Sequence, residues 1–273
     1  ADAYYAEPDF NPSFPEYQSP QNKQKNGSFC QGAGFGSRPS DLAGGIGLIY
    51  DGGGDDDYTG GVFSTATAYF FSTGMVYDAG GNDLYHTQWY GCAGNAHQSA
   101  CILLDKGGND SYTNLQSCGV ASGHDVSIAW LVDEGGDDTY AGAGHSLGAS
   151  NECGAGYFVD FDGVDSYRSP NEKLTLGRGY FSNELCAPPP PDGYGNWAMQ
   201  LYRLDHYYNF GFFVDAGGDD DTYDSRFADI ENGRGSLLKP RPPPVDLHSF
   251  SLRTRRLFRR EVALREHRIL PST

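Results

Sequence analysis

The chain lacks several features that mark common classes of protein. It has no apolar run long enough to cross a bilayer, so we expect no membrane span. Its six cysteines include no C-x-x-C pair, which argues against a zinc ribbon. Neither an H-E-x-x-H helix nor a phosphate-binding P-loop occurs. Histidine precedes serine at His145-Ser146 and His248-Ser249, but adjacency in sequence is not a catalytic triad.

Basic residues are also scarce. The chain has 19 Lys and Arg against 36 Asp and Glu, a net charge of −17, which excludes non-specific affinity for nucleic acid over most of the surface. The imbalance is uneven, because residues 239–273 contain nine basic and three acidic residues, whereas residues 1–238 contain 10 and 33. An acidic body of this kind repels itself unless cations bind to it.

Glycine and tyrosine are abundant, with 38 and 19 residues, and they recur in one motif, Asp-x-Gly-Gly-x-Asp-x-Tyr. Its copies read DGGGDDDY at 51–58, DAGGNDLY at 78–85, DKGGNDSY at 105–112 and DEGGDDTY at 133–140. A degenerate copy, DFDGVDSY, occupies 160–167, and DAGGDDDTY at 215–223 has one extra residue. The copies start 27 or 28 residues apart, except the last, which follows after 55, or two periods. This repetition predicts a repeat architecture.

Each motif follows a short segment that ends in large apolar residues, such as FSTGMVY or VSIAWLV, which is typical of a strand. The paired glycines predict a turn. No helical period occurs between motifs. A propeller blade needs about 40 residues or more. We therefore predict an all-β fold, a parallel β-helix or β-solenoid with coils of about 27 residues.

The repeat array divides the chain into three regions. Residues 1–40 are predicted to form an irregular N-terminal arm. Residues 41–223 form the solenoid repeat domain, with a Pro-rich excursion at 168–212 that must leave any sheet. Residues 224–273 form a Pro-rich linker and basic tail, of which 247–268 could be helical. Either end could cap the solenoid.

Stacked coils place equivalent residues about 4.8 Å apart, so motif residues should form ladders. Two carboxylates beside a Gly-Gly turn suit Ca²⁺, which prefers six to eight oxygen ligands. The predicted ligands are Asp51, Asp56, Asp78, Asp83, Asp105, Asp110, Asp133, Asp138, Asp160, Asp165, Asp215 and Asp220. The predicted aromatic ladder is Tyr58, Tyr85, Tyr112, Tyr140, Tyr167 and Tyr223. The alternative is that these Asp residues only accept hydrogen bonds from turn amides.

The segments Gly80-Gly81-Asn82-Asp83-Leu84-Tyr85 and Gly107-Gly108-Asn109-Asp110-Ser111-Tyr112 resemble the RTX repeats of secreted bacterial proteins, G-G-x-G-x-D-x-U-x. That resemblance implies that the second Asp of each motif binds Ca²⁺ beside turn carbonyls. RTX units recur every nine residues, however, and these recur about every 27. The motif also resembles the D-x-G-G-x-D-x-Y repeats of uncharacterised exported bacterial proteins, which implies no known activity.

Three further sets of residues occupy similar positions in successive repeats. Cys92 and Cys118 lie 14 and 13 residues after their motif Asp, which predicts a disulfide between adjacent coils. His97 and His124 share one phase, which favours either a metal site or a polar ladder. The tyrosine ladder is either structural or part of a glycan-binding face.

These features favour a non-catalytic, extracellular structural protein that calcium stabilises, as a subunit of a surface or matrix filament. The even cysteine count and the absence of an initiator Met fit an exported chain. The basic tail could bind the acidic body of the next copy and so form a homopolymer. The alternatives are a β-helical polysaccharide-degrading enzyme and a glycan-binding adhesin.

Overall fold

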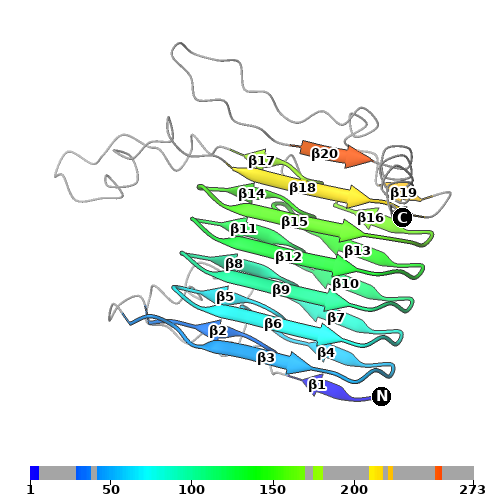
Figure 1. Ribbon diagram of the computed structural model, residues 1–273, viewed down its shortest axis with the longest axis horizontal. Coiled ribbons are helices and arrows are strands. Elements are labelled where there is room, and N and C mark those ends of the chain that lie inside the picture. The colour runs from blue at the N-terminus through cyan, green and yellow to red at the C-terminus, as the bar shows by residue number, and fades with distance from the viewer. Residues whose placement is uncertain are drawn as a thin grey trace, which may run out of the picture.

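The computed structural model describes residues 1–5, 29–37, 42–169, 175–180, 209–217, 221–223 and 250–253 (Figure 1). These residues form three parallel β-sheets that wind into a solenoid, and the described part of the chain contains no helix. The prediction of a parallel β-solenoid with coils of about 27 residues is confirmed. Each coil contributes one strand to each sheet, so a repeat contains three strands where the sequence indicated one strand and a return path.

The first sheet contains the strand that follows each Gly-Gly turn. Its strands are, in spatial order, β1 (Ala3–Tyr5), β4 (Asp57–Thr59), β7 (Leu84–Thr87), β10 (Ser111–Asn114), β13 (Thr139–Gly142), β16 (Ser166–Arg168) and β19 (Thr222–Tyr223). The register pairs Tyr58 with Tyr85, and Tyr85 with Tyr112. A shift of one repeat along the chain therefore moves a residue up by one coil.

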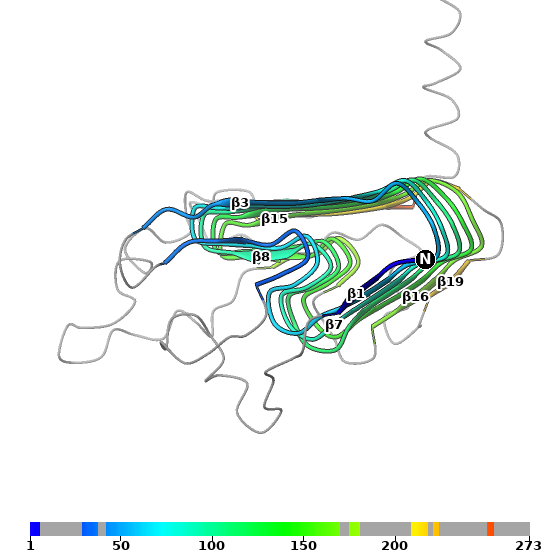
Figure 2. The same ribbon diagram turned by 90° about the horizontal axis from the view of Figure 1, so that it is seen from below.

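The third sheet contains the apolar segment that precedes each turn. Its strands are β3 (Ile46–Tyr50), β6 (Thr73–Asp78), β9 (Ala100–Asp105), β12 (Ile128–Asp133), β15 (Ala155–Asp160), β18 (Phe210–Asp215) and β20 (Phe250–Arg253). The second sheet is made of short strands: β2 (Gly34–Phe35), β5 (Ala68–Tyr69), β8 (Gly94–Ala96), β11 (Ser122–His124), β14 (Ser150–Asn151) and β17 (Gly179–Tyr180). Viewed along the stack, successive coils superpose (Figure 2).

The main core lies between the third and first sheets. Val76, Leu103, Leu131, Phe158 and Phe213 point inward from consecutive strands of the third sheet, and each is almost fully buried. They meet the tyrosines of the first sheet, since the Tyr140 ring packs edge-on against Phe158 at 4.8 Å. The alternation in β6, β9 and β12 places every second residue in this core.

Three boundaries differ from the sequence prediction. β1 and β2 lie within residues 1–40, which we expected to be an irregular arm. β17 and β18 begin within the predicted excursion, so the array continues through part of it. β20 lies in the segment that could be helical and pairs with β18. The remainder of that segment, including the basic residues 255–268, lies outside the described residues.

The Gly-Gly turn explains why the repeat depends on glycine. Gly108 and Gly136 have φ values of 149° and 146°, which side chains rarely adopt. A Cβ atom on Gly136 would also lie 1.3 Å from the carbonyl oxygen of Gly108 in the coil below. The degenerate copy retains this glycine as Gly163, where a Cβ would meet the Gly136 oxygen at 1.6 Å. The close approach of backbone from coil to coil therefore requires the second glycine.

Candidate metal centre

Two rows of aspartates face each other inside the corner between the third and first sheets. The first ladder contains the Asp that ends each strand of the third sheet: Asp51, Asp78, Asp105, Asp133, Asp160 and Asp215. The second ladder contains the Asp that precedes each strand of the first sheet: Asp56, Asp83, Asp110, Asp138 and Asp165. All are at least 95% buried, which is unusual for carboxylates.

Hydrogen bonds saturate most of the first ladder. Asp105 Oδ1 accepts a hydrogen bond from the Gly107 amide at 3.0 Å, and Asp78 Oδ1 accepts one from Gly80 at 3.0 Å. Asp105 Oδ2 accepts from the hydroxyls of Tyr85 and Tyr112 at 2.7 and 2.9 Å. The alternative interpretation, in which these residues only accept hydrogen bonds from turn amides, thus accounts for Oδ1 of Asp78 and Asp105 but not for Oδ2.

The second ladder makes a different set of contacts. Asp110 Oδ1 accepts from the Asp83 amide at 2.6 Å, and Asp83 Oδ1 accepts from the Asp56 amide at 2.7 Å. The other oxygen, Oδ2, of Asp56, Asp83 and Asp110 is buried and meets no hydrogen-bond donor of the protein. Each side chain therefore turns one bare carboxylate oxygen into the corner.

The predicted tyrosine ladder is present and bonds to the first row of aspartates. Tyr58, Tyr85, Tyr112 and Tyr140 stack with ring centroids 4.6–4.8 Å apart and nearly parallel planes. Tyr167 and Tyr223 continue the stack at 5.3 and 5.0 Å. Tyr4 extends it below Tyr58 at 4.7 Å, although it precedes every complete motif. The hydroxyl of each tyrosine reaches a first-ladder carboxylate, a role that the sequence pattern did not reveal.

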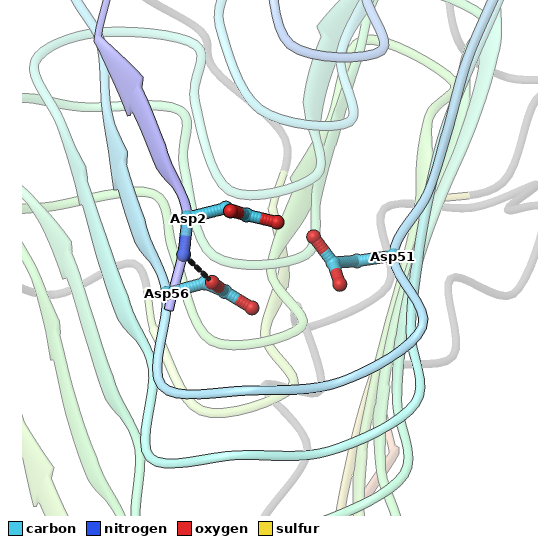
Figure 3. A group of neighbouring side chains, drawn as sticks. All are labelled: Asp2, Asp51 and Asp56. Carbon is cyan, nitrogen blue, oxygen red and sulfur yellow. Dashed lines mark hydrogen bonds between the residues drawn. The ribbon is translucent and has the colours of Figure 1, made fainter.

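The carboxylates form groups of three that could hold a metal ion. In each group the ligand oxygens lie within 4.8 Å of one another. Five of these groups are Asp2, Asp51 and Asp56 (Figure 3); Asp56, Asp78 and Asp83; Asp83, Asp105 and Asp110; Asp110, Asp133 and Asp138; and Asp138, Asp160 and Asp165. Oxygens on opposite sides of a calcium ion are about 4.6–5.2 Å apart, because each Ca–O distance is about 2.3–2.6 Å. The donor set and its spacing therefore fit a hard divalent cation.

Two ligand positions differ from the sequence prediction. Asp2 occupies the second-ladder position of the lowest coil, because its amide donates to Asp56 Oδ1 as Asp56 donates to Asp83. At the upper end the Asp165 amide donates to Asp221 Oδ1 at 3.1 Å, so Asp221 takes the ladder position. The extra residue in the last motif shifts the register by one. Asp220, which we predicted, lies outside the described residues.

Burial and mutual repulsion oppose ionisation in this corner. The pKa of Asp83 is raised to about 7, mainly by desolvation and in part by the carboxylates of Asp78 and Asp105. Desolvation and the charge of Asp105 raise the pKa of Asp110 to about 9. At neutral pH the array thus gains stability from any species that neutralises it, either a proton or a cation.

The predicted disulfide between Cys92 and Cys118 is wrong, because both residues are free thiols in the structure. The register explains the error. Ser122 of β11 pairs with Gly94 of β8, which places Val120 level with Cys92, so Cys118 lies two places out of line with Cys92. Cys92 Sγ instead lies 3.3 Å from Thr87 Oγ1, and Cys118 Sγ lies near Ser117.

The histidines of adjacent coils form a polar ladder. The rings of His97 and His124 lie 6.0 Å apart. His97 Nδ1 contacts the Asp125 carboxylate, and His124 Nδ1 lies 2.6 Å from Asn151 Oδ1. Each imidazole therefore has its own partner on the next coil, as the polar-ladder interpretation of this phase expects.

Residues 144–148, Gly-His-Ser-Leu-Gly, match the G-x-S-x-G spacing of a nucleophile elbow. An elbow needs a serine exposed on a turn between a strand and a helix. Ser146 is instead fully buried and forms an isolated parallel bridge with Gly119 of the neighbouring coil. His145 is also buried, and desolvation lowers its pKa to about 3. The pattern therefore does not form a nucleophile elbow here.

No protein family, curated protein or solved structure matches this chain. The resemblance to RTX repeats therefore stays a prediction. The described residues include no helix that is long and apolar enough to cross a membrane.

Proposed function

We propose that the protein is a non-catalytic structural protein of the extracellular space, stabilised by calcium ions that bind between its coils. The observation that carries this proposal is the bare Oδ2 oxygen of Asp56, Asp83 and Asp110, buried within groups of three carboxylates. A buried charge without a partner is destabilising, and a coordinated cation removes that cost.

The residues present fit calcium better than a smaller or softer ion. All ligands in these five groups are carboxylate oxygens, which hard cations prefer, whereas zinc and copper sites favour nitrogen and sulfur. Bound calcium would supply positive charge at the corner. The chain's own residues would then do the positioning: the Asp83 and Asp110 amides hold Oδ1 of the next coil, and the tyrosine hydroxyls hold the first ladder.

Repetition supports a structural task over a catalytic one. The same carboxylate arrangement occurs in one coil after another, whereas a catalytic site needs one pair of acids in one place. Extracellular calcium sites work with dissociation constants of about 10⁻⁴–10⁻³ M, so weak sites of this kind would be filled outside the cell. The disulfide argument for export no longer holds for Cys92 and Cys118, and the location rests on calcium.

Assembly into a filament through the basic tail remains part of the proposal. The tail residues that would contact the acidic body, from Arg255 onward, lie outside the described residues. High salt should weaken this contact, because it would join exposed charges.

The test is to remove calcium and measure stability. The full chain is treated with a chelator, metal removal is verified by mass spectrometry, and the melting temperature is compared with and without added Ca²⁺. A ligand that binds only the folded state at 100 times its dissociation constant stabilises it by about 2.7 kcal/mol per site. We expect calcium to restore a large fall in melting temperature, and magnesium to restore much less.

Terbium provides a second readout. Because the Tyr112 hydroxyl bonds to Asp105 and Asp133, an ion held by these groups lies close to a tyrosine ring, and Tb³⁺ bound there should luminesce on tyrosine excitation. Asp110→Asn should weaken the signal, and Asp57→Asn, an exposed carboxylate on β4, should not. An unchanged melting temperature after verified metal removal, with no sensitised terbium signal, would defeat the calcium proposal.

A further inference from the structure

The outer face of the third sheet is partly exposed, and the outward side chains of its strands carry no charge. The outward positions of β3, β6, β9, β12 and β15 alternate with the core positions, and none of them is occupied by Asp, Glu, Lys, Arg or His. Large apolar side chains fill the middle of this face, including Met75, Tyr77, Ile102, Leu104, Trp130 and Val132. At its lower end Ile46 and Tyr50 are 80% and 70% exposed.

An apolar outer face is unusual for a sheet of this kind. Parallel sheets that are apolar on both faces are normally covered on both. Exposed apolar patches of a few hundred Å² or more on soluble proteins mark interaction sites. The third sheet therefore indicates an interface.

The aromatic rings on this face favour protein over sugar as its occupant. Tyr50 stacks on Tyr77 with centroids 5.0 Å apart and planes 3° apart. Trp130 stacks on Tyr157 at 4.0 Å and 12°. The rings thus cover one another's faces along the stack, whereas a glycan-binding platform needs ring faces open to the sugar. What remains exposed is a flat surface of ring edges and aliphatic groups, which suits a second flat apolar sheet.

The charge distribution favours a second copy of this chain. The net charge of −17 opposes self-association over most of the surface. The exposed carboxylates of Asp55, Asp57 and Asp137 lie at the Gly-Gly turns or just beyond them, and that of Glu134, just after β12, forms an ion pair with Lys106. Two copies can therefore approach through this face without opposing like charges.

The area is sufficient for a specific contact. The strands β3, β6, β9, β12, β15 and β18 are about 4.8 Å apart and about 17–20 Å long, which gives a footprint of roughly 500–600 Å². Two such faces would bury roughly 1,100 Å², just above the roughly 1,000 Å² expected of a biological interface. Packed sheets lie about 10 Å apart, which the outward side chains would fill.

We propose that two copies of this chain pack face to face through the outer surface of the third sheet. The two-fold axis would lie in the interface, parallel to the direction in which the coils stack. The strands of the two copies then run antiparallel, and the acidic turns of the copies lie at opposite margins of the interface. The contact is isologous, so it closes as a dimer. It uses no residue of the metal centre and does not depend on the calcium proposal.

The experiment is sedimentation velocity with light scattering on the full chain across a range of concentrations. We expect a concentration-dependent dimer. Trp130→Lys places a charge at the centre of the face, and a central aromatic residue is a typical hot spot, so the dissociation constant should rise roughly 30-fold or more. Trp130 points away from the core and is 38% exposed, so the variant should keep the wild-type circular dichroism.

The matched control is Leu115→Lys, which introduces the same charge at an exposed apolar residue outside the sheets. This variant should dimerise like the wild type. A wild type that stays monomeric, or two variants with equal dissociation constants, would overturn the proposal.

Three other occupants have distinct outcomes, and each would also overturn it. If a dimer appears only when residues 254–273 are deleted, the chain's own tail covers the face. If the monomer binds phosphatidylcholine vesicles or cellulose and Trp130→Lys abolishes this, the face binds lipid or polysaccharide. Repeating the sedimentation in chelator separates the two proposals, since a dimer that persists without calcium supports this one alone.

Discussion

The two aspartate ladders contain the same residue type, at similar burial, a few ångströms apart, yet they have different tasks. In the first ladder Asp105 accepts hydrogen bonds from one turn amide and two tyrosine hydroxyls. In the second ladder Asp110 accepts one amide hydrogen bond and turns its other oxygen into the corner without a donor. In these coils the first-ladder carboxylate therefore holds the turn. The second-ladder carboxylate keeps one oxygen without a donor, as those of Asp56 and Asp83 also do, and this oxygen makes the corner a candidate metal centre.

The largest effect should come from Gly136→Ala, because it disrupts the stacking that brings the two ladders together. The new Cβ would overlap the Gly108 carbonyl oxygen, and the residue has a φ of 146°. We expect a loss of roughly 4 kcal/mol or more in the free energy of unfolding, measured by chemical denaturation.

The control for this variant is Gly52→Ala. A Cβ on Gly52 meets nothing within 4 Å, and the next motif already has Ala79 at this place. This variant should keep wild-type stability. Equal effects of the two substitutions would contradict the close approach of the coils.

The next largest effect should be a pH dependence of the metal-free protein. Desolvation raises the pKa of Asp83, Asp110 and Asp138 to about 7, 9 and 8, from an ordinary value of 3.8. Folding thus favours their protonated forms. Their contribution to stability is present in full below about pH 4 and is lost as the pH rises through 7 to 9.

Denaturation midpoints measured in chelator from pH 6 to pH 9 should therefore fall. In saturating calcium the fall should disappear, because the ion competes with protons for the same oxygens. A metal-free protein that becomes more stable over this range would show that the second ladder is paired in a way that the structure does not contain.

A pair of isosteric substitutions sharpens the contrast between the ladders. Asp110→Asn replaces a buried carboxyl that is either charged without a partner or protonated at a pH far above its ordinary pKa. In chelator it should therefore stabilise the protein by about 1 kcal/mol or more, and in calcium it should destabilise it. Asp105→Asn turns an amide donor toward the hydroxyls of Tyr85 and Tyr112 and should destabilise by about 1–3 kcal/mol in both conditions.

The measurement is urea denaturation of both variants with and without calcium. If Asp105→Asn and Asp110→Asn respond alike to calcium, the distinction between the two ladders is wrong.

The smallest effect should come from Tyr112→Phe, which keeps the ring stack and removes one hydroxyl. That hydroxyl donates toward both Asp105 and Asp133 at 2.9 and 2.7 Å, so its loss should cost about 1–2 kcal/mol in thermal unfolding. Tyr77→Phe, on the outer face of the third sheet, is the matched control and should change stability by less than about 0.5 kcal/mol. A cost as small as that of the control would mean that the hydroxyl adds nothing to the first ladder.

Much of the fold could be predicted because the same motif recurs at nearly equal spacing in the sequence. Equal spacing of Tyr58, Tyr85 and Tyr112 was enough to predict their stacking, since parallel coils place equivalent residues above one another. The same logic failed for Cys92 and Cys118. Their positions in the repeat already differ by one residue, and one inserted residue adds a second place of shift, which a disulfide does not tolerate.

The turns that lead into and out of the second sheet could not be predicted from the sequence either. Pairs of non-glycine residues turn the chain with positive φ, such as Phe70 and Phe71 at 57° and 51°, and His97 and Gln98 at 61° and 53°. These residue types do not predict a turn in the way that a Gly-Gly pair does. The second sheet therefore passed unnoticed, and with it the division of each coil into three strands.

The sequence by itself determined the period, the parallel stacking and the identity of the carboxylates that line one corner, because these follow from which residue types recur at equal spacing. Tertiary structure decided which oxygen of each carboxylate is satisfied, since that depends on donors from the coils above and below. It also decided that every second residue of the third sheet faces outward and that this face is uncharged. A one-dimensional pattern of apolar residues is the same whether a sheet is covered on one face or on both, and only the packed coils show which face is left exposed.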